Sequence, residues 1–523
     1  MGRHFTSATE TPHQAVSLMA ESAIGAGDYA RLGVGGYVRR AADGVPLALQ
    51  NSSSGVTALV PATLVDGGSG AWGRTSFNGQ FFRSVLALGS GRFAVVFSGN
   101  GSQADTGVNL RLYNPMRVPV SPRVVVASAT GVVGTRLARA GADHIAVAWT
   151  EGAVLKLAIH SAGSGAVVAS ETTVATLASS DVQGWNLAAL SGGDFVLAYG
   201  KSGGSDLVFR RFNAAGVLQG GETVVEAGAS PAFVGVLALR VGGFVVHHYR
   251  YASGTAYKFA RFSADGSQQG ALTTLAAGSP NRSVSPSERN AMELTNGHLV
   301  FVDPSSNTSA AVRLYDAAGN YLSTLAVATG AAGMPNTVCM CPRQFGGFWL
   351  TVGGQLYEYD NAGISLRQSL LAPTQPFMLF DRAGTGPLMA VHTVGSGFTT
   401  HLYSWNADLS AIESTLVLST SSSYPLSYAW TEVLSSGMLV SVACGQPSSG
   451  AAQLHVTIPQ ASSILGIAQE AALPGAMVRV ATAGKFATTQ SFTSPAFDRR
   501  SATPPGTRGV AIGNTAILGG LSD

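Results

Sequence analysis

Short apolar runs alternate with turn residues along most of the chain, and one kind of run recurs about every fifty residues. The run usually follows a glycine and is rich in Val, Phe, Leu and Ala, as in GRFAVVF, GDFVLAY and GGFVVHH. A continuous apolar run of this length indicates a strand buried on both faces. The eight runs align on one apolar position: Phe93, Ile145, Phe195, Phe244, Leu299, Phe348, Leu388 and Leu439.

A second pattern follows many of these runs and consists of an aromatic residue, a small polar residue, two small residues and glycine. Asn, Asp or Ser caps a tight turn with its own side chain, and glycine accepts a positive φ, which is the chemistry of a hairpin. The aromatic residue then belongs to the incoming strand. The copies are FNAAG at 212–216, FSADG at 262–266, YDAAG at 315–319, YDNAG at 359–363 and a worn WNADL at 405–409.

Four strands fit into each repeat, as residues 184–228 illustrate with WNLAALSG, DFVLAYGK, DLVFRRFN and GETVVEA. A period of about fifty with four short strands per unit predicts a β-propeller. We therefore predict an all-β fold with eight four-stranded blades. The spacing between Phe348 and Leu388 is shorter than the others, which leaves seven blades as the alternative. A helical interpretation is disfavoured because Gly and Ser interrupt the windows with helical period.

The last repeat stops before its fourth strand, after AQLHVTIP. The segment VTALVPATLVDGG at 56–68 is a spare strand near the other end of the chain. We predict that residues 56–66 complete the eighth blade, so that no terminal blade keeps an unpaired edge. The propeller then spans residues 56–460. The flanks, residues 1–55 and 461–523, are brought to one place by this closure, and we expect them to form one small β domain.

Composition narrows the classes of function. Charged residues make up 11% of the 523 residues, against roughly 25% in an average soluble domain. The mean hydropathy is +0.24, yet no stretch approaches about 18 uninterrupted apolar residues, so no membrane span is expected. A large β core or surface buried against partners explains the hydropathy. The net charge is only +3 and the chain has no Lys/Arg run, so the sequence shows no basic segment of the kind that binds nucleic acid.

The first residues and the cysteine count agree with synthesis in a reducing cytosol. The start of the chain lacks the charged segment and apolar core of a Sec signal peptide. Three cysteines, Cys339, Cys341 and Cys444, are too few and odd in number for a disulfide framework.

Signals for catalysis are weak. GKSGG at 200–204 matches the nucleophile pattern G-x-S-x-G, but a strand follows it where a helix is needed, so a loop is favoured. Cys339 and Cys341 do not provide the four ligands of structural zinc, and His247 and His248 lie on a core strand. We expect no catalytic residues, metal or cofactor. A pair of carboxylates for sugar hydrolysis remains an open alternative, because such a pair meets in space and not in sequence. The candidates are Asp194, Glu293, Asp303, Glu358 and Asp381.

Aromatic side chains on propeller loops can stack on sugars. Most of the tryptophans are expected in the core between blades. Trp185, beside the polar segment DVQG, is the candidate for contact with a surface glycan. The six tryptophans are Trp72, Trp149, Trp185, Trp349, Trp405 and Trp430.

The flanks carry a resemblance to a known class of proteins. ILGIAQEAALPGAMVRVATAG at 464–484 resembles a short β module of tailed-bacteriophage structural proteins, in which an ILGIA strand, Ala-rich residues and a Gly turn precede a strand ending T-x-G. ESAIGAGDYARLGVGGYV at 21–38 resembles the matching N-terminal hairpin. GNTAILGGL resembles the C-terminal segments of such proteins. The repeat itself is similar to bacterial and phage propellers of the L-x-x-G-G-F-V-V … F-x-A-x-G type.

The resemblance implies a non-enzymatic virion protein, a component of the phage tail or its fibres, assembled in the bacterial cytoplasm. Its expected partners are other virion proteins, further copies of itself and a host-surface glycan. A head-fibre or collar protein is nearly as plausible. A carbohydrate-binding or carbohydrate-active propeller is the second hypothesis, and a bacterial surface adhesin is the third.

Overall fold

The computed structural model describes residues 84–421 with gaps, and within residues 14–64 and 428–519 it describes only strands. The regular elements of the described residues are β-strands, and this part of the chain holds no helix long and apolar enough to cross a bilayer. The gaps lie at 90–91, 100–106, 114–118, 130–131, 179–183, 204, 251–255, 278–289, 307–308, 329–338, 344–345, 353–354, 370–375, 382–386, 394–397 and 406–408.

The described strands include eight four-stranded antiparallel sheets, numbered here 1 to 8 in chain order of their first strands. The first strands are β6 (Val85–Ala87), β10 (Val132–Ala140), β14 (Trp185–Ala189), β18 (Pro231–Ala238), β22 (Ala291–Glu293), β26 (Cys339–Pro342), β30 (Pro376–Phe380) and β34 (Tyr428–Val433). The second strands are β7 (Phe93–Gly99), β11 (His144–Glu151), β15 (Phe195–Gly200), β19 (Phe244–Arg250), β23 (Leu299–Ser306), β27 (Phe348–Val352), β31 (Leu388–Thr393) and β35 (Leu439–Gly445).

The third and fourth strands form the outer half of each sheet. The third strands are β8 (Gly107–Tyr113), β12 (Val154–Ser161), β16 (Leu207–Phe212), β20 (Ala256–Phe262), β24 (Ser309–Tyr315), β28 (Gln355–Tyr359), β32 (Phe398–Trp405) and β36 (Gln453–Thr457). The fourth strands are β9 (Val124–Ala127), β13 (Val167–Thr176), β17 (Thr223–Glu226), β21 (Gln268–Ala277), β25 (Tyr321–Ala328), β29 (Ser365–Ser369), β33 (Ile412–Ser421) and, in sheet 8, β5 (Thr63–Leu64).

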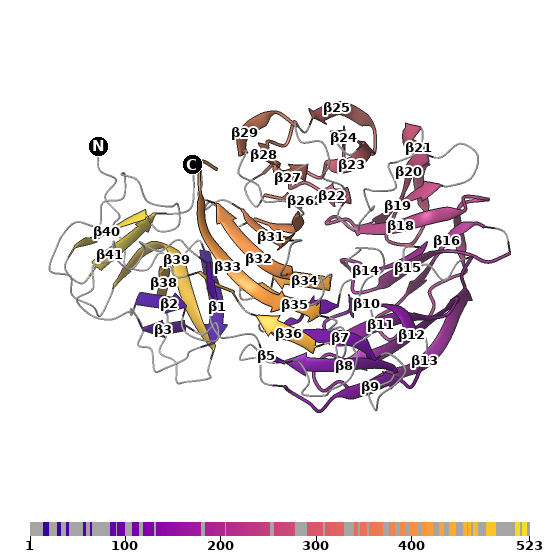
Figure 1. The fold of residues 1–523 in the computed structure, drawn as a ribbon, viewed down its shortest axis with the longest axis horizontal. Coiled ribbons are helices and arrows are strands. Elements are labelled where there is room, and N and C mark those ends of the chain that lie inside the picture. Colours follow the sequence, from indigo (N-terminus) through magenta and orange to yellow (C-terminus); the bar gives the residue numbers. More distant parts are fainter. Residues whose placement is uncertain are drawn as a thin grey trace.

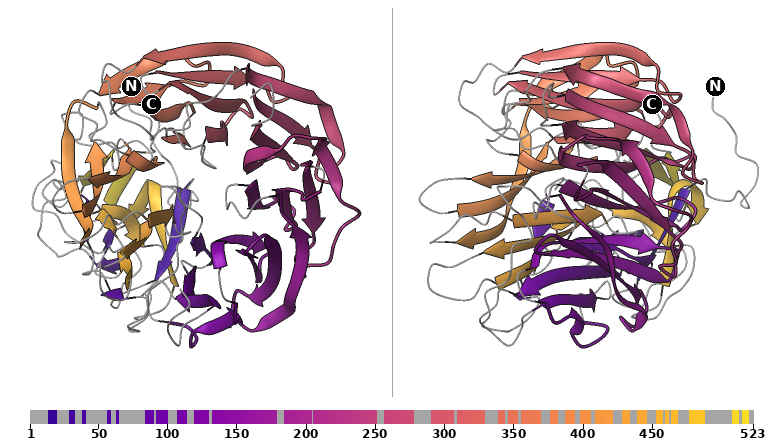
Figure 2. Two further views of the ribbon diagram at one scale, coloured as in Figure 1. Left: turned by 45° about the vertical axis from the view of Figure 1, so that its right-hand side comes forward. Right: turned by 90° about the vertical axis from the view of Figure 1, so that its right-hand side faces the viewer.

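Consecutive sheets contact each other mainly along their first strands. β10 contacts β6 and β14, β18 contacts β14 and β22, and β26 contacts β22 and β30. β34 of sheet 8 also contacts β6 of sheet 1. Figure 2 shows the sheets following one another around an axis, with the first strands inside and the fourth strands outside. The all-β propeller fold predicted from the repeat is therefore confirmed.

The segment predicted to complete the eighth blade divides into two strands with different partners. Thr63 and Leu64 of β5 pair with β36 opposite Val456 and His455, and so supply the fourth strand of sheet 8. The earlier strand, β4 (Val56–Ala58), pairs instead with β37 (Pro459–Ala461) in a separate two-stranded sheet. Pro61 lies between them in the sequence, and proline has no N–H for a strand ladder.

Strands from both chain ends share one seven-stranded sheet, to one side of the propeller in Figure 1. The order is β3-β2-β38-β39-β41-β40, and β1 also pairs with β39. Its strands are β1 (Gln14–Met19), β2 (Tyr29–Leu32), β3 (Val38–Arg40), β38 (Ile464–Ala468), β39 (Met477–Ala487), β40 (Arg508–Ile512) and β41 (Thr515–Gly519).

The hydrophobic core lies between consecutive sheets. One cluster joins Leu157 of sheet 2 to Trp185 and Phe195 of sheet 3, and another joins Phe209 of sheet 3 to Phe244 of sheet 4. The second strands whose side chains are described are covered on both faces, and all six residues of β15 are buried. This double burial explains why the second strands read as continuous apolar runs.

An aromatic pair recurs in several sheets. The residue that begins the second strand lies directly opposite the aromatic residue that ends the third. Stacked pairs of this kind contribute about 0.5–1.5 kcal/mol beyond their buried area. The repeat therefore keeps an aromatic residue before each turn because it has a cross-strand partner. The stacked pairs are Phe93–Tyr113 and Phe348–Tyr359, with ring centroids 4.9 Å apart, and Phe195–Phe212 and Phe244–Phe262, at 5.2 Å.

Candidate functional site

The turns between third and fourth strands form a repeated surface feature. In sheet 3, Asn213 Oδ1 accepts a hydrogen bond from the backbone N–H of Val217 at 2.9 Å, and Gly216 has a φ of 80°. In sheet 4, Asp265 Oδ1 accepts from the N–H of Ser267 at 2.9 Å. These side-chain caps and the positive φ confirm the turn chemistry predicted from the sequence.

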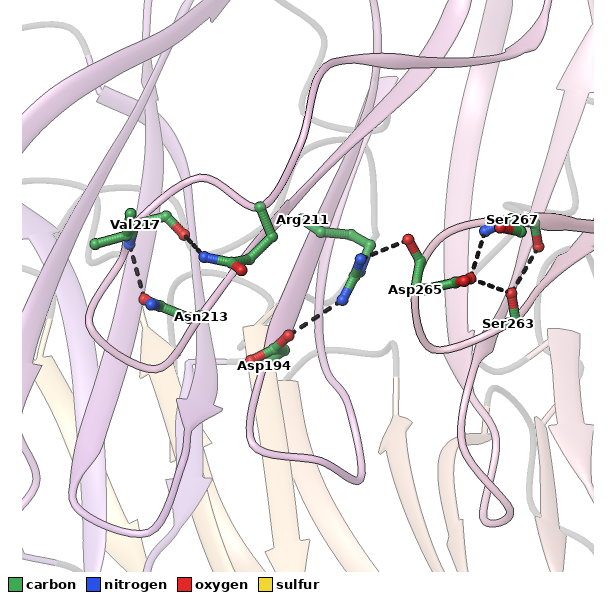
Figure 3. A network of polar contacts seen from close by, with 8 residues as sticks. Asp194, Arg211, Asn213, Val217, Ser263, Asp265 and Ser267 are labelled. Atoms are coloured by element: carbon green, nitrogen blue, oxygen red, sulfur yellow. Dashed lines mark hydrogen bonds and ion pairs between the residues drawn. The ribbon is translucent and has the colours of Figure 1, made fainter.

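Arginines link the turns of neighbouring sheets, as Figure 3 shows for Arg211 of β16. Its Nη1 donates to the backbone carbonyl of Asp265 in sheet 4 at 2.6 Å, and its Nη2 donates to Asp194 Oδ2 at 3.2 Å. Arg261 of β20 repeats the link by donating to the carbonyl of Ala318 in sheet 5. The sequence interpretation missed this contact, although an Arg before the aromatic residue in FRRFNAAG and FARFSADG was an available signal.

The five carboxylates considered for sugar hydrolysis are spread over sheets 3, 5, 6 and 7, and each lies beside its own donor or cation. A hydrolytic pair requires two carboxyl groups facing one bond of the substrate. The contacts found among the described residues instead hold each carboxylate in a separate structural pair. The partners are Arg211 for Asp194, the backbone N–H of Arg240 for Glu293, Arg313 for Asp303, Arg343 and Arg367 for Glu358, and Trp349 Nε1 for Asp381.

His247 and His248 are both fully buried and face different neighbouring sheets. His248 Nε2 lies 2.6 Å from Glu226 Oε2 on β17 of sheet 3, and Lys258 Nζ lies 2.6 Å from the other oxygen of the same carboxylate. Burial alone would raise the pKa of Glu226, but the hydrogen bonds from His248 and Lys258 lower it to about 2. This group is therefore an ionic link between sheets 3 and 4.

His247 lies on the other face, among aromatic residues. Its Nδ1 is 3.0 Å from the hydroxyl of Tyr257, and its ring lies against Phe233 of its own sheet and Phe301 of sheet 5. Burial lowers the pKa of His247 to about 3, so the imidazole is neutral at pH 7. Among the described residues no three or more His, Cys, Asp or Glu side chains gather as a metal site.

Trp185 is completely buried, so the expectation that it contacts a surface glycan is wrong. It begins β14, which packs against β10 of the preceding sheet, and the guanidinium carbon of Arg136 on β10 lies 4.3 Å from the centre of its ring. The polar DVQG neighbours in the sequence did not reveal this contact between sheets. Trp149, Trp349 and Trp405 are buried as well, while the side chains of Trp72 and Trp430 lie outside the described residues.

The remaining motifs are parts of the framework. Gly200 of GKSGG is the last residue of β15, and the described residues after it lead toward β16, with Lys201 Nζ 2.5 Å from Glu222 Oε1. Cys339 and Cys341 are buried on β26. The side chain of Cys444 lies outside the described residues.

Exposed apolar side chains gather just after the turns between third and fourth strands in several sheets, within three residues of the turn glycine. They are 42–62% exposed. Sheet 4 has Gln268 and Gln269 in this place. No comparable signal was taken from the sequence, because single apolar residues beside a turn resemble ordinary strand residues. The exposed residues are Val167 and Val168 in sheet 2, Val217 and Leu218 in sheet 3, Tyr321 and Leu322 in sheet 5, and Ile364 and Leu366 in sheet 6.

Comparisons with known proteins concern the fold. No protein-family model matches the chain, and no curated protein matches its sequence. Among solved structures it is similar to the Dos1 propeller, with a TM-score of 0.45 and 8% identity over 78% of this chain and 96% of that one. It is also similar to the polysaccharide lyase Uly1, with a TM-score of 0.40 and 9% identity over 86% of this chain and 100% of that one. A third similar structure is prolyl oligopeptidase B from Galerina marginata, with a TM-score of 0.34 and 13% identity over 62% of this chain and 47% of that one. The strand topology identifies the fold as a β-propeller, and identities this low carry no conclusion about function.

Proposed function

We propose that this chain is a non-enzymatic structural protein of a bacteriophage particle, a component of the tail or its fibres. The observation that carries the proposal is the pairing of the two segments that resemble phage β modules. Tyr29 and Ala30 of β2 lie opposite Ile467 and Gly466 of β38, although more than four hundred residues separate them. The sequence resemblance at the two ends and their pairing in one sheet are independent observations that agree with an attachment module.

The propeller in this proposal is a closed ring of eight blades, finished by β5. Two observations support closure. β5 pairs with β36, and β34 of the last sheet contacts β6 of the first. A ring that closes through a strand from near the chain start has no unpaired terminal blade, and this stabilises the ring against opening.

The seven-stranded sheet acts as an attachment domain built from residues 1–55 and 461–523. Its strands come from both ends of the chain, so one anchoring unit holds the start and the end of the propeller together. The ring then presents its turns and outer strands to neighbouring virion subunits or to the host surface. The protein assembles in the bacterial cytoplasm, forms homo-oligomers in the particle and binds no nucleic acid.

The absence of a catalytic role is part of the proposal. The carboxylates that sequence patterns offered for catalysis are held by structural partners, for example Glu358 by Arg343 at 2.9 Å. The aromatic residue offered for sugar binding, Trp185, is buried. These observations favour a structural role over the alternative of a carbohydrate-binding or carbohydrate-active propeller.

Location in the particle tests the proposal directly. Mass spectrometry of purified phage particles should detect the chain, and antibody labelling in the electron microscope should place it on the tail or fibres. Labelling at the head or neck would favour the head-fibre or collar alternative. The purified chain should not depolymerise polysaccharides; rapid depolymerisation, or absence of the chain from particles, would refute the structural role.

A further inference from the structure

The contact between sheets 4 and 5 holds a fully buried histidine among aromatic rings. His247 of β19 has no exposed surface. The centroid of its ring lies 5.6 Å from that of Phe233 in sheet 4, 5.9 Å from that of Tyr257 and 6.2 Å from that of Phe301 in sheet 5. Aromatic and aliphatic side chains of both sheets form one cluster around it. Such surroundings suit a neutral imidazole, whereas a charge placed in them is costly unless it has a partner.

The hydrogen bonds of His247 fit a neutral ring better than a charged one. Its Nδ1 lies 3.0 Å from the hydroxyl of Tyr257. Its Nε2 is buried and has no hydrogen-bond partner among the described residues. This nitrogen lies over Gly235 of β18, where a Cβ atom would be only 2.1 Å from it. A protonated imidazole has two N–H donors, so protonation in place would bury an unpaired donor together with the charge.

Among the described residues of this contact, each carboxylate already has another partner. Asp303 Oδ2 of β23 lies 3.9 Å from Arg313 Nη2, and Glu293 of β22 accepts a backbone N–H from the turn after β18 at 2.6 Å. Burial, and then the charge of His248, lower the pKa of His247 to about 3, whereas a carboxylate acting on the ring would raise it. The other titratable and charged residues described at this contact are Tyr249, Tyr257, Arg261, Glu293, Asp303, Arg313 and Tyr315.

The opposite face of β19 is built in the opposite way. His248 is also fully buried, but its Nε2 lies 2.6 Å from Glu226 Oε2 in sheet 3, and Lys258 Nζ lies 2.6 Å from Oε1 of the same carboxylate. Burial alone would raise the pKa of Glu226, but the hydrogen bonds from His248 and Lys258 lower it to about 2, so the carboxylate stays charged at pH 4.5. A proton on His248 therefore faces a negative charge, and the contact between sheets 3 and 4 keeps its ion pair in acid.

We propose that the contact between sheets 4 and 5 is an acid-sensitive switch: protonation of His247 separates these two sheets locally, while the contact between sheets 3 and 4 holds. Separation exposes the imidazole to water, where it binds a proton readily, so a falling pH favours the separated state and neutral pH the closed one. Asp303 acts in the opposite direction, because burial raises its pKa, and a variant of His247 is needed to isolate the histidine. The switch is a property of the propeller itself and goes beyond the proposed function.

Thiol labelling of cysteines placed on either side of sheet 4 tests the inference. Ala291→Cys lies on β22 in the cluster between sheets 4 and 5, and Ala188→Cys lies on β14 in the cluster between sheets 3 and 4. Both alanines are buried, so labelling requires opening. The pyridyl disulfide dithiodipyridine labels thiols in acid, and peptide mass spectrometry assigns each label. The native Cys339 and Cys341, buried in sheet 6, report general unfolding.

Acid should accelerate labelling at position 291 through His247. Relative to a free thiol at the same pH, the rate should rise about fifty- to hundredfold from pH 7 to pH 4.5, because the pKa of His247 is about 3 in the closed state and 6.5 in the open one. His247→Gln keeps an uncharged polar side chain beside Tyr257 and should abolish this rise, whereas the matched control His248→Gln should retain it. At pH 4.5, position 291 should also be labelled roughly ten times faster than position 188 and Cys339, because local separation precedes general unfolding.

Three results would overturn the inference. They are a rise at position 291 that is less than about tenfold, a rise that persists in His247→Gln, and equal labelling rates at positions 188, 291 and 339 at pH 4.5, which would show general unfolding. Circular dichroism checks that each variant is folded. If His247→Gln does not fold, His247→Phe replaces it, and the same loss of the rise is expected because phenylalanine binds no proton.

Discussion

Two adjacent glycines at the start of β19 allow a sharp test of how the strand is built. Gly242 and Gly243 both have positive φ, 94° and 84°. Alanine in this region costs about 1–2 kcal/mol of backbone strain at either position. Their surroundings differ, however. A Cβ atom at Gly243 would lie 2.3 Å from the carbonyl oxygen of Phe262, whereas at Gly242 the nearest atom, Oγ of Ser191, would be 3.8 Å away.

The clash at Gly243 involves backbone and not a side chain that can rotate. Relief requires β19 and β20 to separate where Phe244 lies opposite Phe262, and these stacked rings are buried. We expect this overpacking to add about 2–3 kcal/mol. Gly243→Ala should then destabilise the protein by about 3–5 kcal/mol, and Gly242→Ala by about 1–2 kcal/mol.

Urea unfolding followed by tryptophan fluorescence and circular dichroism measures the difference. Unchanged slopes with shifted midpoints would show that stability alone has changed. The same pair recurs in sheet 6, where a Cβ atom at Gly347 would lie 2.0 Å from the Tyr359 carbonyl oxygen and one at Gly346 would meet the rotatable amide of Asn361. Equal losses for the two variants of one pair would refute the steric explanation.

Three further predictions concern polar contacts. His247 has a pKa of about 3 in the folded protein against 6.5 in a free side chain, so the unfolded state takes up the proton first as the pH falls below 6.5. By pH 4.5 this should cost about 2–3 kcal/mol, and His247→Phe should flatten the pH dependence of the urea midpoint; an unchanged slope would contradict the assignment. Glu226→Gln should cost about 3 kcal/mol at pH 7. Because the pKa of Glu226 is lowered from 4.5 to about 2, its contribution is complete above pH 4.5, and the difference between variant and wild type in thermal melts should shrink below that pH. Arg211→Ala removes hydrogen bonds to Asp265 and Asp194; it should cost about 1–2 kcal/mol and speed amide exchange in residues 263–267, and unchanged exchange there would count against the link between turns.

The predictions from sequence succeeded where the information is local. Alternation, turn chemistry and the spacing of the apolar runs placed four strands in each repeat, because a turn depends on the φ of its glycine and the oxygen of its capping residue. In the worn copy, Leu409 stands where the other copies have glycine and has a φ of 62°, and its buried side chain packs in the cluster of Trp405. Burial of this leucine offsets the backbone strain.

Tertiary structure decided everything that depends on the neighbouring sheet. Neither the position of Trp185 under Arg136 nor the pairing of only the second part of residues 56–66 with β36 followed from the sequence alone. The Arg before the aromatic residue was a visible signal, but only the packed sheets showed that Arg211 reaches the next turn. Periodicity and turn residues act over a few bonds, so one chain segment reveals them; contacts between sheets join residues far apart in the sequence, and their outcome follows from packing.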